Sequence, residues 1–256
     1  MKIIILGAHS GETKTARCIS FLIDSTLAID AGALTSSLSL EEQKRLKAVL
    51  LTHAHFDHIK DIPLLALNSF RMKTRIKIYS HREVRTTIQN HLLNGSVYPR
   101  FQGLPAEKPT ISFHDIIPFK ERKIENYRVL ALPVNHTENS VGYQISDADG
   151  KALFYPGDSG LGLRECWQHL SCQLLIVETT LPNGYEDYAR LTGHLTPNLL
   201  LAELTAWRQL RGELPRIIVV HRDPLLEDKV KEELKEVAAV LKATILVATE
   251  GMQLKL

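Results

Sequence analysis

The chain has few cysteines and no long apolar run. Its 256 residues include three cysteines, Cys18, Cys166 and Cys172, without the spacing of a disulfide framework or a thiolate metal site. An odd, irregular set is typical of ordinary buried thiols in a reducing compartment, so we expect the cytoplasm. The apolar start from Ile3 to Leu6 is too short for a secretory signal, and no apolar run approaches the length of a membrane span. We therefore expect neither a membrane protein nor a disulfide scaffold.

The chain also has little net charge. Lysine and arginine total 31 against 29 acidic residues, a formal charge of +2, which gives no electrostatic case for binding long nucleic acid or a membrane surface. Basic residues do gather between Arg71 and Arg85. We interpret them as a solvated face, with attraction of an anionic substrate as the alternative. With 44% hydrophobic residues, the chain can bury a large core, and we expect one α/β domain over residues 1–256.

What the chain does contain is a dense group of ligand-type residues. His53, His55, Asp57 and His58 follow directly after the apolar run from Ala48 to Leu51. In an extended segment alternate side chains share a face, so His53 and His55 point the same way, while the chain can then turn into a helix. Neutral imidazole and carboxylate suit Zn, Fe or Mn. We predict a metal site here; a histidine-rich surface loop is the weaker alternative.

Further ligand-type residues follow three other apolar segments. Residues 129–134 lead to His136, residues 152–155 lead to Asp158, and residues 217–220 lead to His221. Functional groups are expected at the ends of strands, where a rigid sheet fixes them and solvent still reaches them. A lone histidine in such a place would usually be structural. A site for two metal ions needs roughly seven protein donors, and the three added positions complete that number.

The remaining pattern predicts the secondary structure. We expect strands first, then two helices opened by capping boxes at Ser39 and Ser80, the second ending near Asn94, and a proline-rich crossing loop. Two later helices complete the second half, where Pro197 suits a first helical turn. The expected strands are Lys2–Gly7, Ser20–Ile23 and Thr26–Ile29, the loop is Pro99–Pro118, and the later helices are Pro197–Arg211 and Glu227–Lys242.

The order HxHxDH, a distant His, Gly-Asp and a C-terminal His resembles the metallo-β-lactamase superfamily of dinuclear hydrolases over nearly the whole chain. This resemblance implies an α/β (α+β) fold, a four-layer αββα sandwich with the metals at one edge of two sheets. It implies two divalent ions, with zinc expected first and Mn or Fe as alternatives. By the same resemblance His53, His55 and His136 hold the first ion, Asp57, His58 and His221 hold the second, and Asp158 bridges them.

Two further segments resemble the phosphodiesterase branch of that superfamily. Residues 178–180 (Glu-Thr-Thr) and 193–197 (Gly-His-Leu-Thr-Pro) are similar to segments of transfer-RNA 3′-processing nucleases and class II cyclic-nucleotide phosphodiesterases. The resemblance implies that His194 is a catalytic acid and not a metal ligand. The alternative is a residue beside a helix N-cap with no chemical role.

The cyclic-nucleotide side is favoured by residues 6–20 and 94–101, which resemble segments of those enzymes. Tyr98 stands where tryptophan is usual, and Phe56 and Asp61 replace the usual leucine and glycine. These departures leave the expected ligands intact and the nucleotide open. The chain lacks a long basic Gly/Pro-rich insertion that could grip RNA, which counts against the nuclease.

We therefore expect a dinuclear phosphodiesterase that cleaves a small phosphodiester, first of all a 3′,5′-cyclic nucleotide. A hydroxide held between two divalent ions would attack phosphorus in line, and by resemblance Asp57 would accept its proton. A carbon-ester, thioester or lactone hydrolase would use the same ligands without needing His194. A non-catalytic metal-binding protein would have a broken ligand set, and none is broken. We expect no membrane partner and no long nucleic acid; a homodimer is compatible with the sequence. His9 could face the pocket from the first loop.

Overall fold

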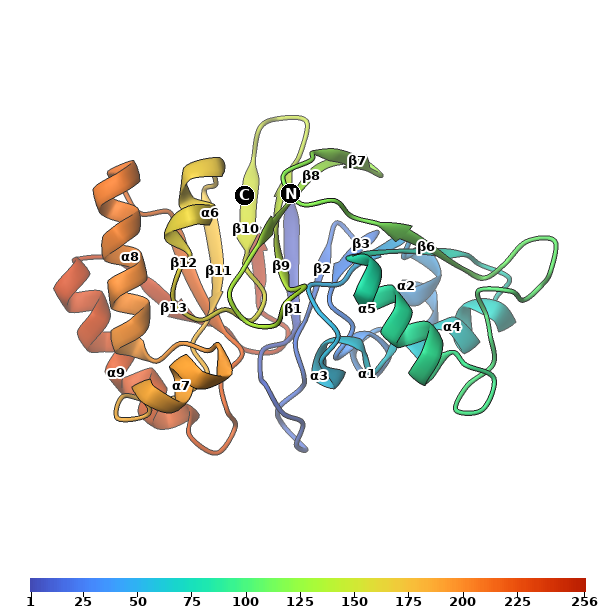
Figure 1. Cartoon of the computed structure of the whole chain (residues 1–256), viewed down its shortest axis with the longest axis horizontal. Helices are drawn as coiled ribbons and strands as arrows, with labels where there is room; N and C mark the ends of the chain where they lie inside the picture. Colours follow the sequence, from blue (N-terminus) through green and yellow to red (C-terminus); the bar gives the residue numbers. More distant parts are fainter.

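The computed structural model describes residues 1–256 and contains two seven-stranded sheets. The first sheet has the order β14 (Gln253–Lys255), β1 (Lys2–Gly7), β2 (Ser20–Ile23), β3 (Leu27–Ile29), β4 (Ala48–Leu50), β5 (Ile76–Ser80) and β6 (Ile111–Asp115). The second has the order β13 (Ile245–Val247), β12 (Arg216–Val220), β11 (Leu174–Glu178), β10 (Ala152–Tyr155), β9 (Val141–Ser146), β8 (Tyr127–Pro133) and β7 (Arg122–Ile124). The two ends of the chain lie side by side, because β14 pairs with β1 (Figure 1).

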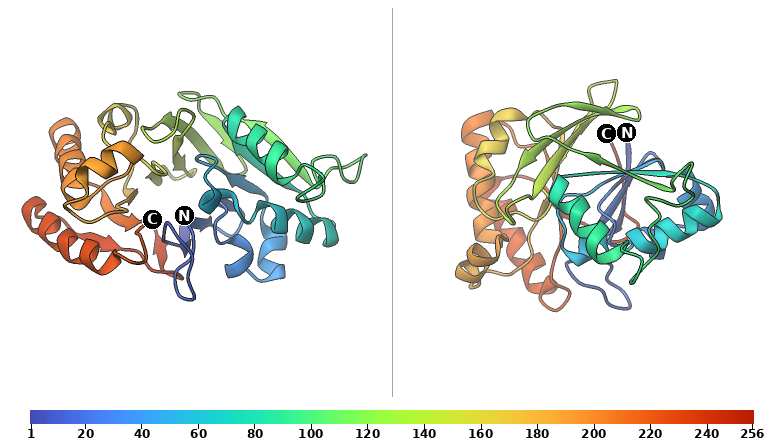
Figure 2. Two further views of the ribbon diagram at one scale, coloured as in Figure 1. Left: turned by 60° about the horizontal axis from the view of Figure 1, so that its bottom comes forward. Right: turned by 45° about the vertical axis from the view of Figure 1, so that its right-hand side comes forward.

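Helices cover the outer faces of both sheets (Figures 1 and 2). Over the first sheet lie α1 (Leu34–Ser37), α2 (Leu40–Arg45), α3 (Phe56–Ile59), α4 (Ile62–Arg71), α5 (Arg82–Thr87) and a π-helical turn, Ile88–Leu92. Over the second lie α6 (Arg164–His169), α7 (Glu186–Thr192), α8 (Pro197–Arg211) and α9 (Glu227–Leu241). None of these helices has the length and apolar character needed to cross a membrane.

Three separate apolar cores lie between these layers. The central core of 27 buried residues joins side chains from both sheets, such as Ile5 and Ile176. A core of 21 residues lies under the helices of the first sheet, and another of 21 lies under α6, α7, α8 and α9. Three cores need four layers, so the predicted αββα sandwich is confirmed.

The sequence of each central strand explains why both of its faces are buried. In β4, Ala48 and Leu50 enter the central core, while Val49 enters the core under the helices. In β11, Leu174 and Ile176 face the centre, while Leu175 faces the outer helices. Successive side chains of a strand point to opposite faces, so a continuous apolar run buries both.

Most of the predicted elements are confirmed within a residue or two. The helix after Ser39 has its capping box, and the later helices occupy Pro197–Arg211 and Glu227–Leu241. The capping box at Ser80 is wrong, because the N-cap of α5 is His81, whose ring accepts the backbone N–H of Glu83. The crossing loop is wrong in part, because the edge strand β6 forms inside it by pairing with β5.

Strand direction determines where the loops carrying the predicted site emerge. In the first sheet β3, β4 and β5 run parallel, and in the second β10, β11 and β12 run parallel. Strand β8 has the direction of β10, because both pair antiparallel with β9. The carboxyl ends of parallel strands meet at one edge of a sheet, so the loops after these strands converge.

Candidate metal centre

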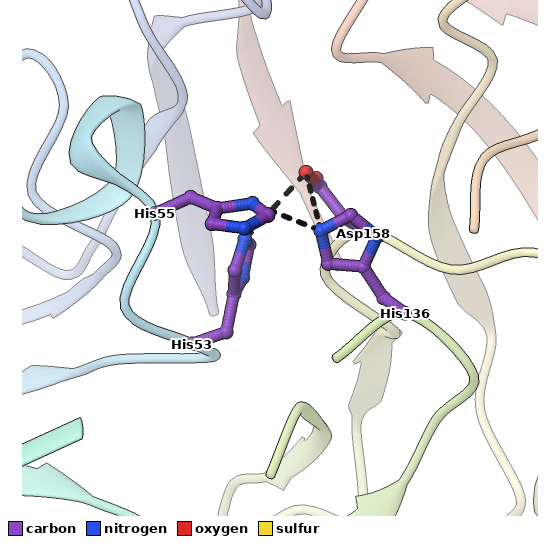
Figure 3. A group of neighbouring side chains, drawn as sticks. All are labelled: His53, His55, His136 and Asp158. Carbon is purple, nitrogen blue, oxygen red and sulfur yellow. Dashed lines mark hydrogen bonds and ion pairs between the residues drawn. The ribbon is translucent and has the colours of Figure 1, made fainter. Parts of the chain in front are cut away.

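The loops after β4, β8 and β10 bring together a first group of side chains. Possible ligand atoms of His53, His55, His136 and Asp158 all lie within 4.8 Å of one another. Figure 3 shows His53 and His55, from one segment of the first sheet, facing His136 and Asp158 from the second. His53 and His55, which we expected to point the same way, therefore both belong to this group.

A second group lies beside the first and shares a carboxylate with it. Asp57, His58, Asp158 and His221 offer atoms that also lie within 4.8 Å of one another. Asp158 Oδ2 is 3.2 Å from His221 Nε2 and 3.7 Å from His53 Nε2, while its Oδ1 is 3.2 Å from His58 Nε2. All seven residues predicted as ligands are therefore brought to one place, with Asp158 between the two groups.

The unsatisfied atoms of this centre fit divalent metal ions. His53 Nε2, His58 Nε2 and Asp158 Oδ1 are buried and make no hydrogen bond within the chain, although the last two form an ion pair. Buried polar atoms normally make hydrogen bonds, and a bound cation would satisfy these three. Burial would raise the pKa of Asp158, but His221 and His58 hold it well below its usual value. Burial also lowers the pKa of His53, favouring the neutral imidazole that can ligate a metal.

The ring nitrogens that face away from the centre are held by the protein. His53 Nδ1 lies 3.1 Å from Thr52 Oγ1, His58 Nδ1 lies 2.7 Å from Asp30 Oδ2, His136 Nδ1 lies 3.0 Å from the Gly193 carbonyl oxygen, and His221 Nδ1 lies 2.9 Å from Thr180 Oγ1. Partners of this kind fix the ring orientation and leave the opposite nitrogen available to a metal. These four imidazoles are therefore oriented before any ion binds.

Asp30 is a functional residue that the sequence analysis missed. It is fully buried after β3 and accepts hydrogen bonds from the backbone and hydroxyl of Thr52 as well as contacting His58. Burial would lower the pKa of His58, but Asp158 and Asp30 raise it well above its usual value. An acidic residue directly after an apolar strand was the available signal.

Glu178 was noted in the sequence as part of a phosphodiesterase-like segment, but its role as a partner of His194 was not predicted. It is fully buried at the end of β11, and its Oε1 lies 2.7 Å from His194 Nδ1. The same carboxylate accepts backbone N–H groups of Ser159, Thr180 and Leu195. Burial would lower the pKa of His194, but Glu178 raises it to about 9. The His194 ring lies 4.8 Å from the His136 ring, centroid to centroid, so the pair sits beside the first group.

Other residues considered in the sequence lie in different surroundings. His9 is buried and lies 2.7 Å from Glu250. It therefore belongs to a polar network and does not face an open pocket. Tyr98 packs against the core under the helices of the first sheet. Phe56 is 64% exposed between two of the predicted ligands. The cations Arg71, Lys73, Arg75 and Lys108 line a surface cavity of about 510 Å³.

Comparisons with known proteins show the family and the fold of the chain. A sequence model of the beta-lactamase superfamily domain matches residues 20–221. The 3′,5′-cyclic-nucleotide phosphodiesterase of Aliivibrio fischeri is 23% identical over 82% of this chain and 76% of its own length. Ribonuclease Z of Pyrococcus horikoshii is 29% identical over 43% of this chain and 34% of its own. The structure of unliganded yeast PDE1 has a TM-score of 0.84 at 18% identity, covering 100% of this chain and 99% of that one, which shows the common fold.

We predict that Asp30→Asn weakens divalent-metal binding about 10- to 100-fold, the usual cost of losing a hydrogen-bond partner behind a metal ligand. The reason is that the substitution removes the carboxylate that orients His58. Chelator competition on purified protein measures the effect. Asp24→Asn is the matched control, because Asp24 also accepts hydrogen bonds, from Lys2 and Tyr127, but lies away from the centre. Wild-type affinity in Asp30→Asn would show that the carboxylate has no orienting role.

Proposed function

The chain belongs to the beta-lactamase superfamily, and from this premise we propose that it is a phosphodiesterase that uses two divalent ions to hydrolyse a small phosphodiester. The first substrate class is a 3′,5′-cyclic nucleotide, as for the relative from Aliivibrio fischeri, whose similarity extends over most of both chains. Long nucleic acid and membranes are not proposed as partners.

The two groups of side chains support a division of the ligands between two ions. His53, His55 and His136 would hold the first ion, Asp57, His58 and His221 would hold the second, and Asp158 would bridge them. The nitrogen and carboxylate donors suit zinc, with manganese or iron as alternatives. When bound, such ions supply a water-derived nucleophile near neutral pH and neutralise the phosphodiester anion.

Asp57 is suited to accept the proton of the attacking water. Its Oδ2 lies 3.1 Å from His221 Nε2, and its side chain keeps 23% of its surface exposed. Burial would raise its pKa, but the hydrogen bond with His221 lowers it. The carboxylate is therefore ionised near neutral pH and keeps part of its surface exposed.

His194 is suited to donate a proton to the leaving oxygen. Glu178 occupies its Nδ1, so the proton on Nε2 is the one available for transfer. A pKa raised to about 9 keeps this ring protonated near neutral pH, while positive charge on neighbouring ions would act in the opposite direction. This Glu178–His194 pair is the observation that favours a phosphodiester over a thioester, because a ribose alkoxide is a poor leaving group that needs a proton.

Two alternatives use the same centre. A transfer-RNA 3′-processing nuclease is supported by the similarity to ribonuclease Z, which extends over less than half of this chain. A carbon-ester, thioester or lactone hydrolase would use the same seven side chains, and its reaction would not need His194.

The ligand arrangement predicts close to two metal ions per chain after reconstitution with Zn, Mn or Fe. Asp158→Ala should lower occupancy at both positions, because its carboxylate lies in both groups, while His136→Ala should weaken mainly one. Elemental analysis of the purified chain measures the ratio. A reproducible value of one or less with every metal would remove the two-ion proposal.

The substrate class is tested by a panel on the reconstituted protein. It contains 3′,5′- and 2′,3′-cyclic nucleotides, bis(p-nitrophenyl) phosphate, precursor transfer RNA, a glutathione thioester and a lactone. We expect the small phosphodiesters to be cleaved fastest, because Glu178 and His194 provide a proton for an alkoxide. A thioester or lactone as best substrate would contradict the phosphodiesterase, and precursor transfer RNA would favour the nuclease.

Replacing His194 should separate proton donation from other roles. A positioned general acid typically contributes about 10² to 10⁴ in rate, whereas p-nitrophenolate leaves with little help. His194→Ala should therefore slow a cyclic nucleotide at least about a hundredfold and slow bis(p-nitrophenyl) phosphate much less, with metal content unchanged. The measurement is kcat/KM for both substrates on both proteins. An equal loss on both would indicate charge stabilisation or positioning, and lost metal would make His194 a ligand.

A further inference from the structure

The turn after β12 places a buried arginine directly behind His221. The Arg222 side chain is 1% exposed, which is unusual for an arginine. Its Nη1 donates to the carbonyl oxygen of Val219 at 3.3 Å, and its Nη2 donates to that of Ala248 at 2.9 Å. The guanidinium therefore joins the ends of two neighbouring segments of the second sheet.

The other side of the guanidinium meets His9, from the loop that leaves β1 in the first sheet. Arg222 Nη2 lies 3.1 Å from His9 Nε2, and since arginine only donates, Nε2 is the acceptor. His9 Nδ1 then donates to Glu250, 2.7 Å away. Glu227 lies 3.5 Å from Arg222 Nε and 3.3 Å from His9 Nε2. We call these four residues, Arg222, His9, Glu227 and Glu250, the Arg222 cluster; Glu227 is the carboxylate that pairs with the buried guanidinium.

The backbone of the same turn is tied to the first sheet as well. The Arg222 N–H donates to the Ala8 carbonyl oxygen at 3.4 Å, and the Arg222 carbonyl oxygen accepts the Ser10 N–H at 3.1 Å. The turn that carries His221 is thus bonded to the loop after β1 by both its backbone and its side chain.

His221 itself has a backbone conformation that requires such support. Its φ of 57° lies in the left-handed region, which is unfavourable for a residue with a Cβ. Residues held in that region persist when the surrounding structure fixes them, and they gather at functional sites. In this conformation His221 Nε2 lies 3.1 Å from Asp57 Oδ2 and 3.2 Å from Asp158 Oδ2.

We propose that Arg222 is a positioning residue, which holds His221 in its left-handed conformation and so sets its reach into the second group of ligands. This role rests on the proposed two-ion function. Arg222 touches no ligand atom of the first group, so its loss should affect the two ions unequally. A residue that served stability alone would affect both ions through the fold or neither.

The test is a zinc titration by calorimetry with chelator competition, together with thermal unfolding of the apo chain. In Arg222→Met we expect one zinc ion to bind about 10- to 100-fold more weakly, the usual loss for an indirect partner of a ligand, and the other to bind as in wild type. Arg222→Lys should recover part of the lost zinc affinity, because lysine keeps the positive charge but lacks the planar set of N–H donors of the guanidinium. If Arg222→Met does not fold, His9→Gln tests the same contact and should give a smaller selective loss.

Arg208→Met is the control for the chemical change. Arg208 also donates to a backbone carbonyl, that of Leu241, but from the last turn of α8. Arg208→Met should bind both zinc ions with wild-type affinity, whether or not its unfolding temperature changes. The positioning role alone would be overturned if Arg222→Lys and His9→Gln both bound the two zinc ions with wild-type affinity. It would also be overturned if the variants lost affinity for both ions equally. A wild-type chain that binds a single ion would overturn the two-ion function and this role with it.

Discussion

The structure depends on one buried carboxylate. Asp158 is 2% exposed and lies within 3.7 Å of imidazole nitrogens from His53, His58, His136 and His221. An unpaired ion at such a depth would cost several kcal/mol, so the charge is tolerable only where imidazole groups or bound cations converge on it. The imidazole groups come from three loops on two sheets, after β4, β8 and β12, and each loop has to leave its strand at the same edge. The parallel direction of the central strands and the apolar packing between the two sheets make this convergence possible.

The same local arrangement recurs around Asp158. A strand ends, the next few residues supply a ligand-type side chain, and a neighbouring loop supplies the group that orients it. Asp30 serves His58 in this way, and Thr180 serves His221. Glu178 makes the same kind of contact with His194, which precedes α8. Asp30 accepts hydrogen bonds from Thr52, and Thr180 donates its hydroxyl to Glu178, so the imidazoles that they contact do not need a metal to find their directions. A centre of this kind is arranged by folding, and the ions would then stabilise an arrangement that already exists.

The sequence predicted which ligand-type side chains lie together, because its signal is local. An apolar run followed within a few residues by histidine or aspartate indicates both the strand and the place where it ends, and this holds for His53, His136, Asp158 and His221. The orienting residues were harder, since Asp30 and Glu178 look like ordinary turn-forming or strand-ending acids until the fold shows them fully buried. The edge strand β6 was missed because it forms by pairing with β5 inside a proline-rich stretch, a contact that local pattern does not contain. The N-cap at α5 was displaced by one residue because the His81 ring took the role expected of Ser80.

The same arrangement explains why the fold does not by itself determine the reaction. At 18% identity the chain superposes on yeast PDE1 with a TM-score of 0.84, so very different side chains can build the same layers. The seven ligand-type residues can serve the hydrolysis of several linkages, since binding an anionic or polarised centre makes no demand on the leaving group. A poor leaving group does make one, because its departing oxygen needs a proton. In this chain the group proposed to deliver it is His194, whose Nδ1 meets a carboxylate that is buried on the far side of its ring. On the proposed function, the choice of reaction would therefore depend on the Glu178–His194 pair, which lies beside the ligand-type residues.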